Sequence, residues 1–303
     1  RERNYGGRGR FVAPDDRSFV DEGRARMAQT ISRPGSTERV RPLRRRSRPL
    51  PWPLSLYRTA VGKKYVMALT GIGLLGFVIV HMIGNLHLYE GPTQIAEYAE
   101  GLRSLGGDLV PRTLLLWVLR VGLIVLFVLH IHSAYTLKEM SRKASPSAGF
   151  MSGQKRYAGG QNFVAANYAS RTMRWTGPII GLYLLFHLAD LTWGWWLGDD
   201  YVRGDVYHNV AESMSSLPVA AIYVVANVAL AVHIFHGAWS LFQSLGINNP
   251  RYNAARRGLA VALSALILVG NLSFPIMVQA GLIDEDGRTT PVGEPFAHQE
   301  ALP

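Results

Sequence analysis

The chain has 303 residues, of which 48% are apolar, a formal net charge of +11, and no cysteine. The lack of cysteine excludes disulfides, cysteine-ligated iron–sulfur clusters, covalently attached haem and thiol catalysis in this chain. The charge is unevenly placed, because residues 1–50 hold 14 Arg whereas five later stretches are almost free of charged side chains. This distribution predicts an all-α integral membrane protein rather than a soluble nucleic-acid-binding protein.

Residues 1–60 are predicted to form a basic arm on the cytoplasmic side of the membrane. The first 50 residues contain Gly, Pro and Ser and have no helical or strand period, so we expect the arm to be largely disordered near anionic lipid headgroups. Docking to an acidic surface of a partner protein is the alternative. We expect no nucleic-acid partner, since the arm lacks interleaved aromatic residues. The sequence begins at Arg1, and Met27 is a candidate initiator.

Five stretches are long and apolar enough to cross a bilayer core of about 30 Å, which takes roughly 20 residues of helix. They lie in a predicted membrane domain of residues 61–282, and an acidic external tail, residues 283–303, follows. The five predicted spans cover about 65–86, 113–137, 177–197, 217–245 and 259–282. We therefore predict a bundle of five transmembrane helices.

The positions of Lys and Arg predict the orientation of this bundle. Residues 1–64, 138–174 and 245–258 hold 27 of the 32 basic residues, and these three segments lie on one side of a five-span chain. Basic residues accumulate on the cytoplasmic side of membrane proteins. We therefore expect a cytoplasmic N-terminus and an external C-terminus.

The histidines are the strongest functional signal in the sequence. Polar side chains within apolar spans are costly and usually functional. Neutral imidazole is a metal ligand, and haem iron accepts two axial imidazoles. The candidates are spread over four of the five spans, and they are His81, His130, His132, His187, His233 and His236.

Depth in the bilayer sorts four of these histidines into two pairs. His81 and His187 lie roughly 20–25 Å from the inner boundary, whereas His130 and His233 lie roughly 12–20 Å from it. We predict that the first pair binds an outer haem and that the second pair binds an inner haem, both without covalent attachment. Two haems at different depths make an electron path across the bilayer.

Two of the ligand assignments stay open. His130 and His132 are about 200° apart on a helix, so they cannot both face one site. We prefer His130, because Ala134 follows one turn later and leaves room for a porphyrin edge. His236 lies one turn from His233, and it is an alternate ligand or a group that reaches a propionate or a quinone.

Further polar residues are candidates for binding haem propionates and quinone. Arg120 is expected either to hold the propionates of the outer haem or to pair with Asp190. A quinone needs an apolar slot with one or two hydrogen-bonding groups close to a haem. The outer quinone candidates are Asn85, His87 and Glu90, and the inner candidates are Tyr57, Arg58 and Trp239. Ordinary helix packing and solvation are the alternative for both groups.

Several stretches resemble the five-helix dihaem cytochrome b subunit of succinate:quinone oxidoreductases. The similarity begins with KKYVMALTGIGLLGFVIVHMIGNL (63–86) and covers about 65–246 with the same order and spacing. It continues through LHIHSAYTL (129–137), SRTMRWTGPIIGLYLLFHLADLT (170–192), YHN (207–209) and HIFHGAWSLFQSLG (233–246). The resemblance is to the actinobacterial, menaquinone-using type. It implies the axial ligands His81, His130, His187 and His233, and His132 aligns only slightly worse than His130.

This resemblance implies a membrane anchor of succinate dehydrogenase in the bacterial inner (cytoplasmic) membrane, acting in the respiratory chain and the citric acid cycle. A flavoprotein subunit with FAD and an iron–sulfur subunit would oxidise succinate, which this chain alone would not do. Electrons would then pass through two b haems to menaquinone. The alternatives are a dihaem anchor of a fumarate reductase, hydrogenase or formate dehydrogenase, and a histidine-lined transporter without haem. Related proton-coupled fumarate reductases carry Glu two residues before the fourth ligand, where this chain has Ala231.

Overall fold

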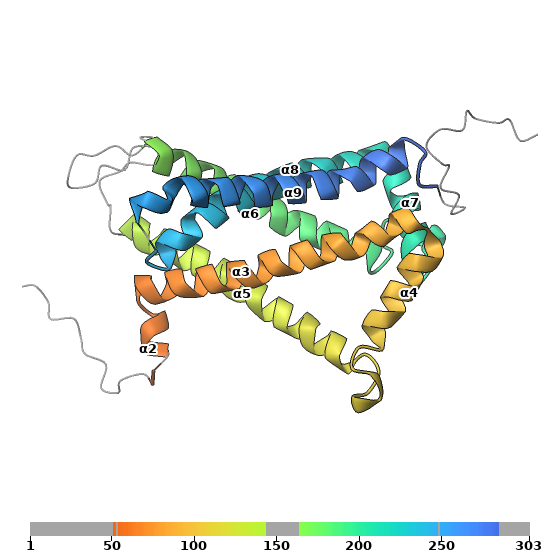
Figure 1. The fold of residues 1–303 in the computed structure, drawn as a ribbon, viewed down its shortest axis with the longest axis horizontal. Coiled ribbons are helices and arrows are strands. Elements are labelled where there is room, and N and C mark those ends of the chain that lie inside the picture. The colour runs from red at the N-terminus through yellow and green to blue at the C-terminus, as the bar shows by residue number, and fades with distance from the viewer. Residues whose placement is uncertain (1–50, 53, 144–163, 248, 285–303) are drawn as a thin grey trace, which may run out of the picture. The chain divides into compact units, whose positions relative to one another are not determined.

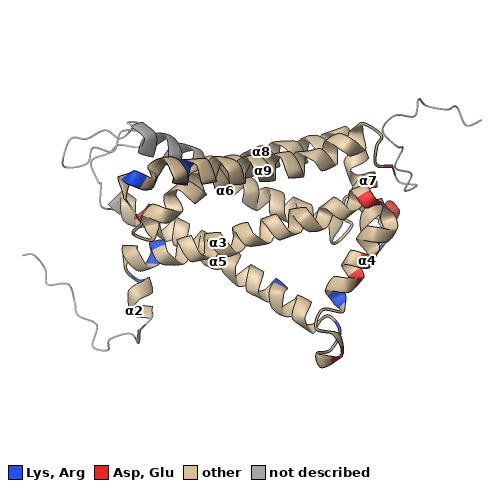
Figure 2. Ribbon diagram, viewed as in Figure 1, with Lys and Arg blue, Asp and Glu red and all other residues tan. Residues whose placement is uncertain are grey.

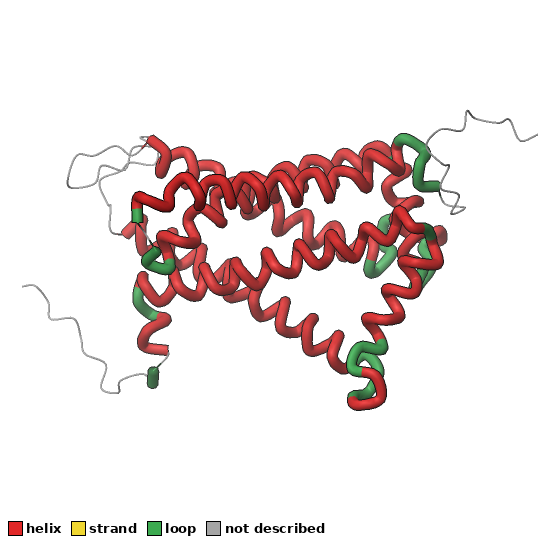
Figure 3. The backbone as a smooth tube through the Cα atoms, viewed as in Figure 1, coloured by secondary structure: helices red, strands yellow, loops and turns green. Residues whose placement is uncertain are grey.

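The computed structural model describes residues 51–52, 54–143, 164–247 and 249–284. The chain divides into two compact units, Arg1–Pro49 and Leu50–Pro303, and every described residue belongs to the second unit. Within the described ranges the chain forms helices and loops without any β-strand, as Figure 3 shows. The all-α prediction is confirmed for these residues. Most of the predicted basic arm and nearly all of the external tail lie outside them.

Five long helices make up most of the described chain, and successive long helices run in opposite directions (Figure 1). They are α3 (Ala60–Asn85), α5 (Leu114–Lys143), α6 (Val164–Leu191), α8 (Leu217–Ser244) and α9 (Asn253–Gln279). Each has 26 to 30 residues. At about 1.5 Å per residue these helices are roughly 39–45 Å long, which exceeds a hydrocarbon core of about 30 Å.

Four of the described helical segments are long and apolar enough to cross a membrane. They are Ala60–Glu90, Leu114–Ser141, Leu217–Ser244 and Pro250–Gln279. Helix α6 is comparably long but less apolar, because Arg174 and Asp190 stand among its hydrophobic residues. It also ends at Leu191, six residues before the predicted end of the third span. The chain turns at Gly194, whose φ of +67° lies in the left-handed region that favours glycine.

Local sequence signals explain where several helices begin. Thr59 precedes α3, and its side-chain oxygen accepts a hydrogen bond from the backbone N–H of Gly62. Asp205 caps α7 (Val206–Ser215) through the N–H of His208. Proline stands in the first turn of α4 (Pro92–Arg103) and of α8, where its missing N–H costs little.

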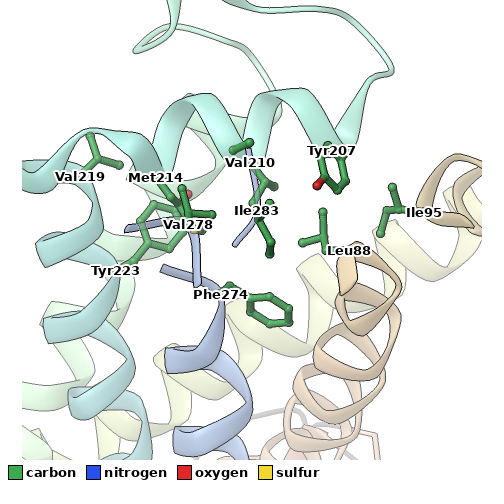
Figure 4. Close-up of a cluster of buried hydrophobic side chains, with 11 residues drawn as sticks. Leu88, Ile95, Tyr207, Val210, Met214, Val219, Tyr223, Phe274, Val278 and Ile283 are labelled. Atoms are coloured by element: carbon green, nitrogen blue, oxygen red, sulfur yellow. The ribbon is translucent and has the colours of Figure 1, made fainter. Parts of the chain in front are cut away.

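Short elements connect the long helices. The chain from α3 to α5 passes through η1 (Leu86–Glu90), α4 and η2 (Gly107–Leu109), and the chain from α6 to α8 passes through η3 (Gly198–Asp200) and α7. Helix α2 (Leu54–Tyr57) precedes α3, and η4 (Pro250–Tyr252) precedes α9. A cluster of buried apolar side chains joins the connecting elements to the long helices, as Figure 4 shows. Its members include Leu88 of η1, Ile95 of α4, Tyr207 of α7 and Phe274 of α9.

Small residues allow the long helices to approach one another closely. Helix α8 packs against α9, α6 and α3, and α3 also packs along α5. A Cβ atom added to Gly73 of α3 would lie 2.7 Å from Leu126 Cδ1 of α5, and one added to Gly270 of α9 would meet the sulfur of Met82. In hydrocarbon, close packing of this kind holds helices together, because burial of apolar surface supplies no driving force there.

The described charges separate toward opposite ends of the helices (Figure 2). Lys63 and Lys64 lie near the start of α3, and Arg256 and Arg257 lie near the start of α9. Acidic residues concentrate at the other end, where α4 and α7 lie. This separation agrees with the charge asymmetry of the sequence.

Candidate functional site

Four histidines from four different long helices meet in two pairs. The ring centres of His81 on α3 and His187 on α6 are 6.0 Å apart, and the two ring planes are inclined by 80°. The ring centres of His130 on α5 and His233 on α8 are 6.4 Å apart, and these planes are inclined by 62°. The pairs are those that the depth argument had selected from the sequence.

The two pairs lie at different levels along the helices. Thr70 of α3 contacts His130, and it precedes His81 by 11 residues. Thr176 of α6 contacts His233 and likewise precedes His187 by 11 residues. At about 1.5 Å per residue, both helices separate the two pairs by roughly 16 Å along the bundle. We call His81 and His187 the outer pair, and His130 and His233 the inner pair.

Threonine hydroxyls hold both rings of the inner pair. The hydroxyl of Thr70 lies 3.1 Å from His130 Nδ1 and donates to the carbonyl oxygen of Val66 at 2.7 Å. The hydroxyl of Thr176 lies 3.3 Å from His233 Nδ1 and donates to the carbonyl oxygen of Thr172 at 3.0 Å. Because each hydroxyl proton is already committed, each threonine oxygen accepts the Nδ1–H of its histidine. In the neutral form of each ring, Nε2 is then available as a ligand atom.

The outer pair has a different set of hydrogen bonds, confined to His187. Its Nδ1 lies 3.3 Å from the hydroxyl oxygen of Tyr223 on α8. That hydroxyl donates to Asp190 Oδ2 at 2.8 Å, and Ser213 of α7 donates to the same oxygen at 2.6 Å. Asp190 is fully buried. It is therefore not available at the surface of the bundle to pair with Arg120.

The histidine spacing fits two-imidazole ligation of a haem. Two metal–imidazole bonds of about 2 Å, with roughly 1 Å from each nitrogen to its ring centre, place axial imidazole centres about 6 Å apart. A bare metal ion would need further protein ligands, and no group of three or more His, Cys, Asp or Glu in the described residues could hold one. Haem brings its own four equatorial nitrogens, so two histidines are a sufficient protein contribution.

Open space also lies beside the two pairs. A Cβ atom added to Gly237, one turn after His233, would meet no atom within 4 Å, and the same holds for Gly181, six residues before His187. His81 is an exposed residue by its total surface, and its ring lies beside that of His187. No side chain therefore covers Gly181 or Gly237 in the described part of the chain.

The remaining sequence candidates for haem binding make other contacts: His132 and Arg120 contact residues outside the two pairs, and His236 lies one turn from His233. The Nδ1 atom of His132 is 2.5 Å from the hydroxyl of Tyr57, so the ring of His132 is directed to α2 and not to His233. The ring of His236 contacts Phe235. The guanidinium of Arg120 lies 5.1 Å from the ring centre of Trp117, and within the described chain it forms no ion pair with Asp190.

The outer quinone candidates lie together where α3 ends. His87 Nδ1 is 2.9 Å from Glu90 Oε2, and the centre of the His87 ring lies 4.9 Å from that of Tyr98 of α4, with the two planes inclined by 31°. Tyr98 also covers Gly84, where an added Cβ atom would lie 2.5 Å from its hydroxyl. Asn85 is the last residue of α3. The sequence did not identify Tyr98 as a neighbour of this group.

The inner quinone candidates are less closely associated. Tyr57 contacts α5 through His132 and Ser133, and the Lys63 ammonium lies 4.3 Å from its ring centre. Trp239 instead lies beside Phe235 and beneath Arg257 of α9. Arg58 follows Tyr57 at the start of the membrane unit. No described contact brings Tyr57 and Trp239 together.

Sequence reasoning missed Thr70, Thr176 and Tyr223 as partners of the histidines. A signal for the two threonines was present, because TGIGLLGFVIVH (70–81) in α3 and TGPIIGLYLLFH (176–187) in α6 both begin with Thr-Gly and have His eleven residues after the Thr. Phe77 and Tyr183 occupy the same place in the two segments, and each contacts the ring of the histidine that follows it. The two halves of the chain therefore build corresponding sites.

Comparison with known proteins gives one match. Residues 157–272 match the sequence model of a family described as the succinate dehydrogenase/fumarate reductase transmembrane subunit. This segment is a little over a third of the chain and includes His187 and His233, whereas His81 and His130 lie outside it. The matched part of the chain is therefore similar to a transmembrane subunit of these complexes. The comparisons with curated proteins and with solved structures found no match.

Proposed function

We propose that this chain is the two-haem cytochrome b membrane anchor of a succinate dehydrogenase. The proposal rests on the outer and inner histidine pairs, which lie on four long helices and have ring centres 6.0 Å and 6.4 Å apart. The family match supports the same class of complex. His81 and His187 would hold the outer haem, and His130 and His233 would hold the inner haem.

The bound haems would supply one-electron carriers between the catalytic subunits and a quinone. The protein's own part is to present four imidazoles, and Thr70, Thr176 and Tyr223 hold three of them, those of His130, His233 and His187, through Nδ1. Second-shell hydrogen bonds of this kind orient metal-ligating histidines. Arg120 is the candidate for holding the propionates of the outer haem, since it is exposed at the outer half of α5.

The charge separation supports a proposed orientation. The basic end of the helices would face the cytoplasm of a bacterial cell, with the N-terminus inside and five membrane passes that include α6. A flavoprotein with FAD and an iron–sulfur subunit would dock at this end. The iron–sulfur clusters would belong to the partner, because this chain has no cysteine to ligate one. The basic arm would remain near the same membrane surface.

The quinone, which we take to be menaquinone, would bind at the outer end of α3. The support is the group of Asn85, His87 and Glu90, which lies within about two turns of His81. Asn85→Ala, His87→Ala and Glu90→Gln should each impair succinate:quinone activity and leave activity with a soluble dye acceptor intact. Glu97→Gln on α4 is the matched control. Unchanged quinone kinetics in all three variants would shift the proposed site to Tyr57, Arg58 and Trp239.

Purification of the tagged chain from its native membrane tests the proposed function. A flavoprotein, an iron–sulfur protein and succinate:quinone activity should co-purify with the chain. Hydrogenase or formate dehydrogenase subunits in their place would assign it to another quinone-linked complex. A chain without haem absorption would favour a histidine-lined transporter.

A further inference from the structure

A buried carboxylate lies behind the outer histidine pair, and ligation alone does not require it. Asp190 stands three residues after His187 on α6 and is fully buried. Its Oδ2 atom accepts hydrogen bonds from Ser213 of α7 and Tyr223 of α8, whereas Oδ1 has no hydrogen-bond partner among the described residues. Burying such a group is costly, and charged residues at membrane depth are usually functional.

The direction of the hydrogen bonds connects this carboxylate to the histidine. Tyr223 donates its hydroxyl proton to Asp190 at 2.8 Å. Its oxygen is then left to accept the Nδ1–H of His187 at 3.3 Å. A tyrosine oxygen whose proton is held by a carboxylate is a stronger acceptor, because hydrogen bonds in a chain polarise one another. With Asp190 ionised and Nδ1 of His187 protonated, this chain of hydrogen bonds gives His187 more electron density than a hydrogen bond to a neutral group would.

The other three histidines lack this arrangement. His130 and His233 are bonded to threonines whose protons go to backbone carbonyl oxygens. His81 makes no hydrogen bond through its ring to any residue in the described ranges. In the first half of the chain, Arg120 occupies the position that corresponds to Tyr223, and Gly84 occupies the position that corresponds to Asp190. The carboxylate thus acts on one ligand of one pair.

We propose that Asp190 and Tyr223 are positioning residues that strengthen His187 as an electron-donating ligand and lower the reduction potential of the outer haem. This inference rests on the proposed function. A carboxylate behind a ligating histidine raises the basicity of the ligand. A more basic axial ligand favours the oxidised iron, and axial ligands and their hydrogen bonds are among the means by which proteins set haem potentials.

Redox titration of the purified complex, followed by haem absorption, tests the proposal. Asp190→Asn and Tyr223→Phe should each raise the midpoint potential of the outer haem and leave the inner haem unchanged. The double variant should shift the outer potential no further than Tyr223→Phe does, because both residues act through one hydrogen-bond chain. Tyr223→Phe keeps the aromatic ring that packs against Tyr183 and Phe186, so it remains informative if Asp190→Asn does not assemble.

Ser213→Ala is the matched control, because it removes the other donor to Asp190 and leaves the bond from Tyr223 in place. It should not raise either potential. The proposal is overturned if both haems shift equally, if neither shifts, or if Asp190→Asn shifts the outer haem while Tyr223→Phe does not. A wild-type complex without haem would instead overturn the proposed function, so the two failures are distinguishable.

Discussion

At the scale of single residues, the partners of each histidine separate candidate ligands from other histidines. His130 faces His233, whereas His132, two residues further along α5, is bonded to Tyr57. His87 is bonded to Glu90, and His208 of α7 contacts the carbonyl oxygen of Asp200. The sequence left the choice between His130 and His132 open, because both stand in the same apolar helix and only the position of α8 distinguishes them.

Replacing the facing histidines should remove the haems selectively. His81→Ala or His187→Ala should remove one haem of two, and His130→Ala or His233→Ala should remove the other, because a single imidazole leaves one axial position of the iron without its ligand. Reduced-minus-oxidised spectra of the purified variants measure this. His132→Ala is the control and should keep both haems. Loss of the inner haem in His132→Ala, together with its retention in His130→Ala, would reverse the assignment.

The threonines behind the inner pair should affect haem binding without being ligands. Thr70→Val or Thr176→Val removes the acceptor for Nδ1–H, and loss of such a partner typically weakens metal-site affinity by roughly 10- to 100-fold. Release of haem to an excess of a haem-scavenging protein gives the measurement. Thr136→Val is the control, since its hydroxyl bonds only to carbonyl oxygens of α5. Equal release rates in all four proteins would argue against the role of the two threonines.

At the scale of elements, the two halves of the chain contribute alike. In the first half, α3 supplies a histidine to the outer pair and α5 supplies one to the inner pair. In the second half, α6 and α8 do so in the same order. Each threonine lies on the first helix of its half and holds the histidine of the second helix. A haem site assembled in this way depends on how the two halves pack together, which involves contacts of α8 with both α3 and α6.

Hydropathy predicted α3, α5, α8 and α9 to within several residues, because long apolar runs are unambiguous. Hydropathy missed α4 and α7, because these helices are short and mix polar with apolar residues. It also extended the third span beyond Leu191, since averaging over a window conceals the turn at Gly194. The level of each histidine along its helix predicted the two pairs, because axial rise fixes levels along parallel or antiparallel helices. It could not select Tyr223, which reaches His187 only through tertiary packing.

Gly84 should be essential for seating α4 against α3. A Cβ atom at this position would lie 2.5 Å from the Tyr98 hydroxyl and 2.7 Å from its ring, and the Tyr98 ring in turn contacts that of His87. Gly84→Ala should therefore lower stability by about 1–3 kcal/mol, as overpacking usually does. Thermal unfolding of the purified protein measures the loss. Gly101→Ala on the same α4 has open space around it and should be neutral or stabilising. Equal effects of the two substitutions would contradict this packing.

At the scale of the whole molecule, the charge separation predicts where the catalytic subunits dock. All five lysines lie within residues 1–64 or 138–174, on the side that we place in the cytoplasm. Lysine-reactive crosslinkers should therefore join this chain to the flavoprotein or the iron–sulfur protein, mainly through residues 138–174, part of which lies outside the described residues. Carboxylate-reactive crosslinkers directed at Glu97 or Asp108, near the opposite end, should not. Partner crosslinks confined to the acidic end would reverse both the docking surface and the orientation.

The number of haems per chain tests the central claim most directly. Two facing histidine pairs, separated by roughly 16 Å along the helices, predict two independent b-type haems that acid–acetone extraction removes, because the chain has no cysteine for covalent attachment. Pyridine haemochrome quantitation of the purified protein, set against its concentration from amino-acid analysis, gives the ratio. We expect two haems b per chain, and one haem or none in protein purified from haem-replete cells would rule out the two-haem assignment.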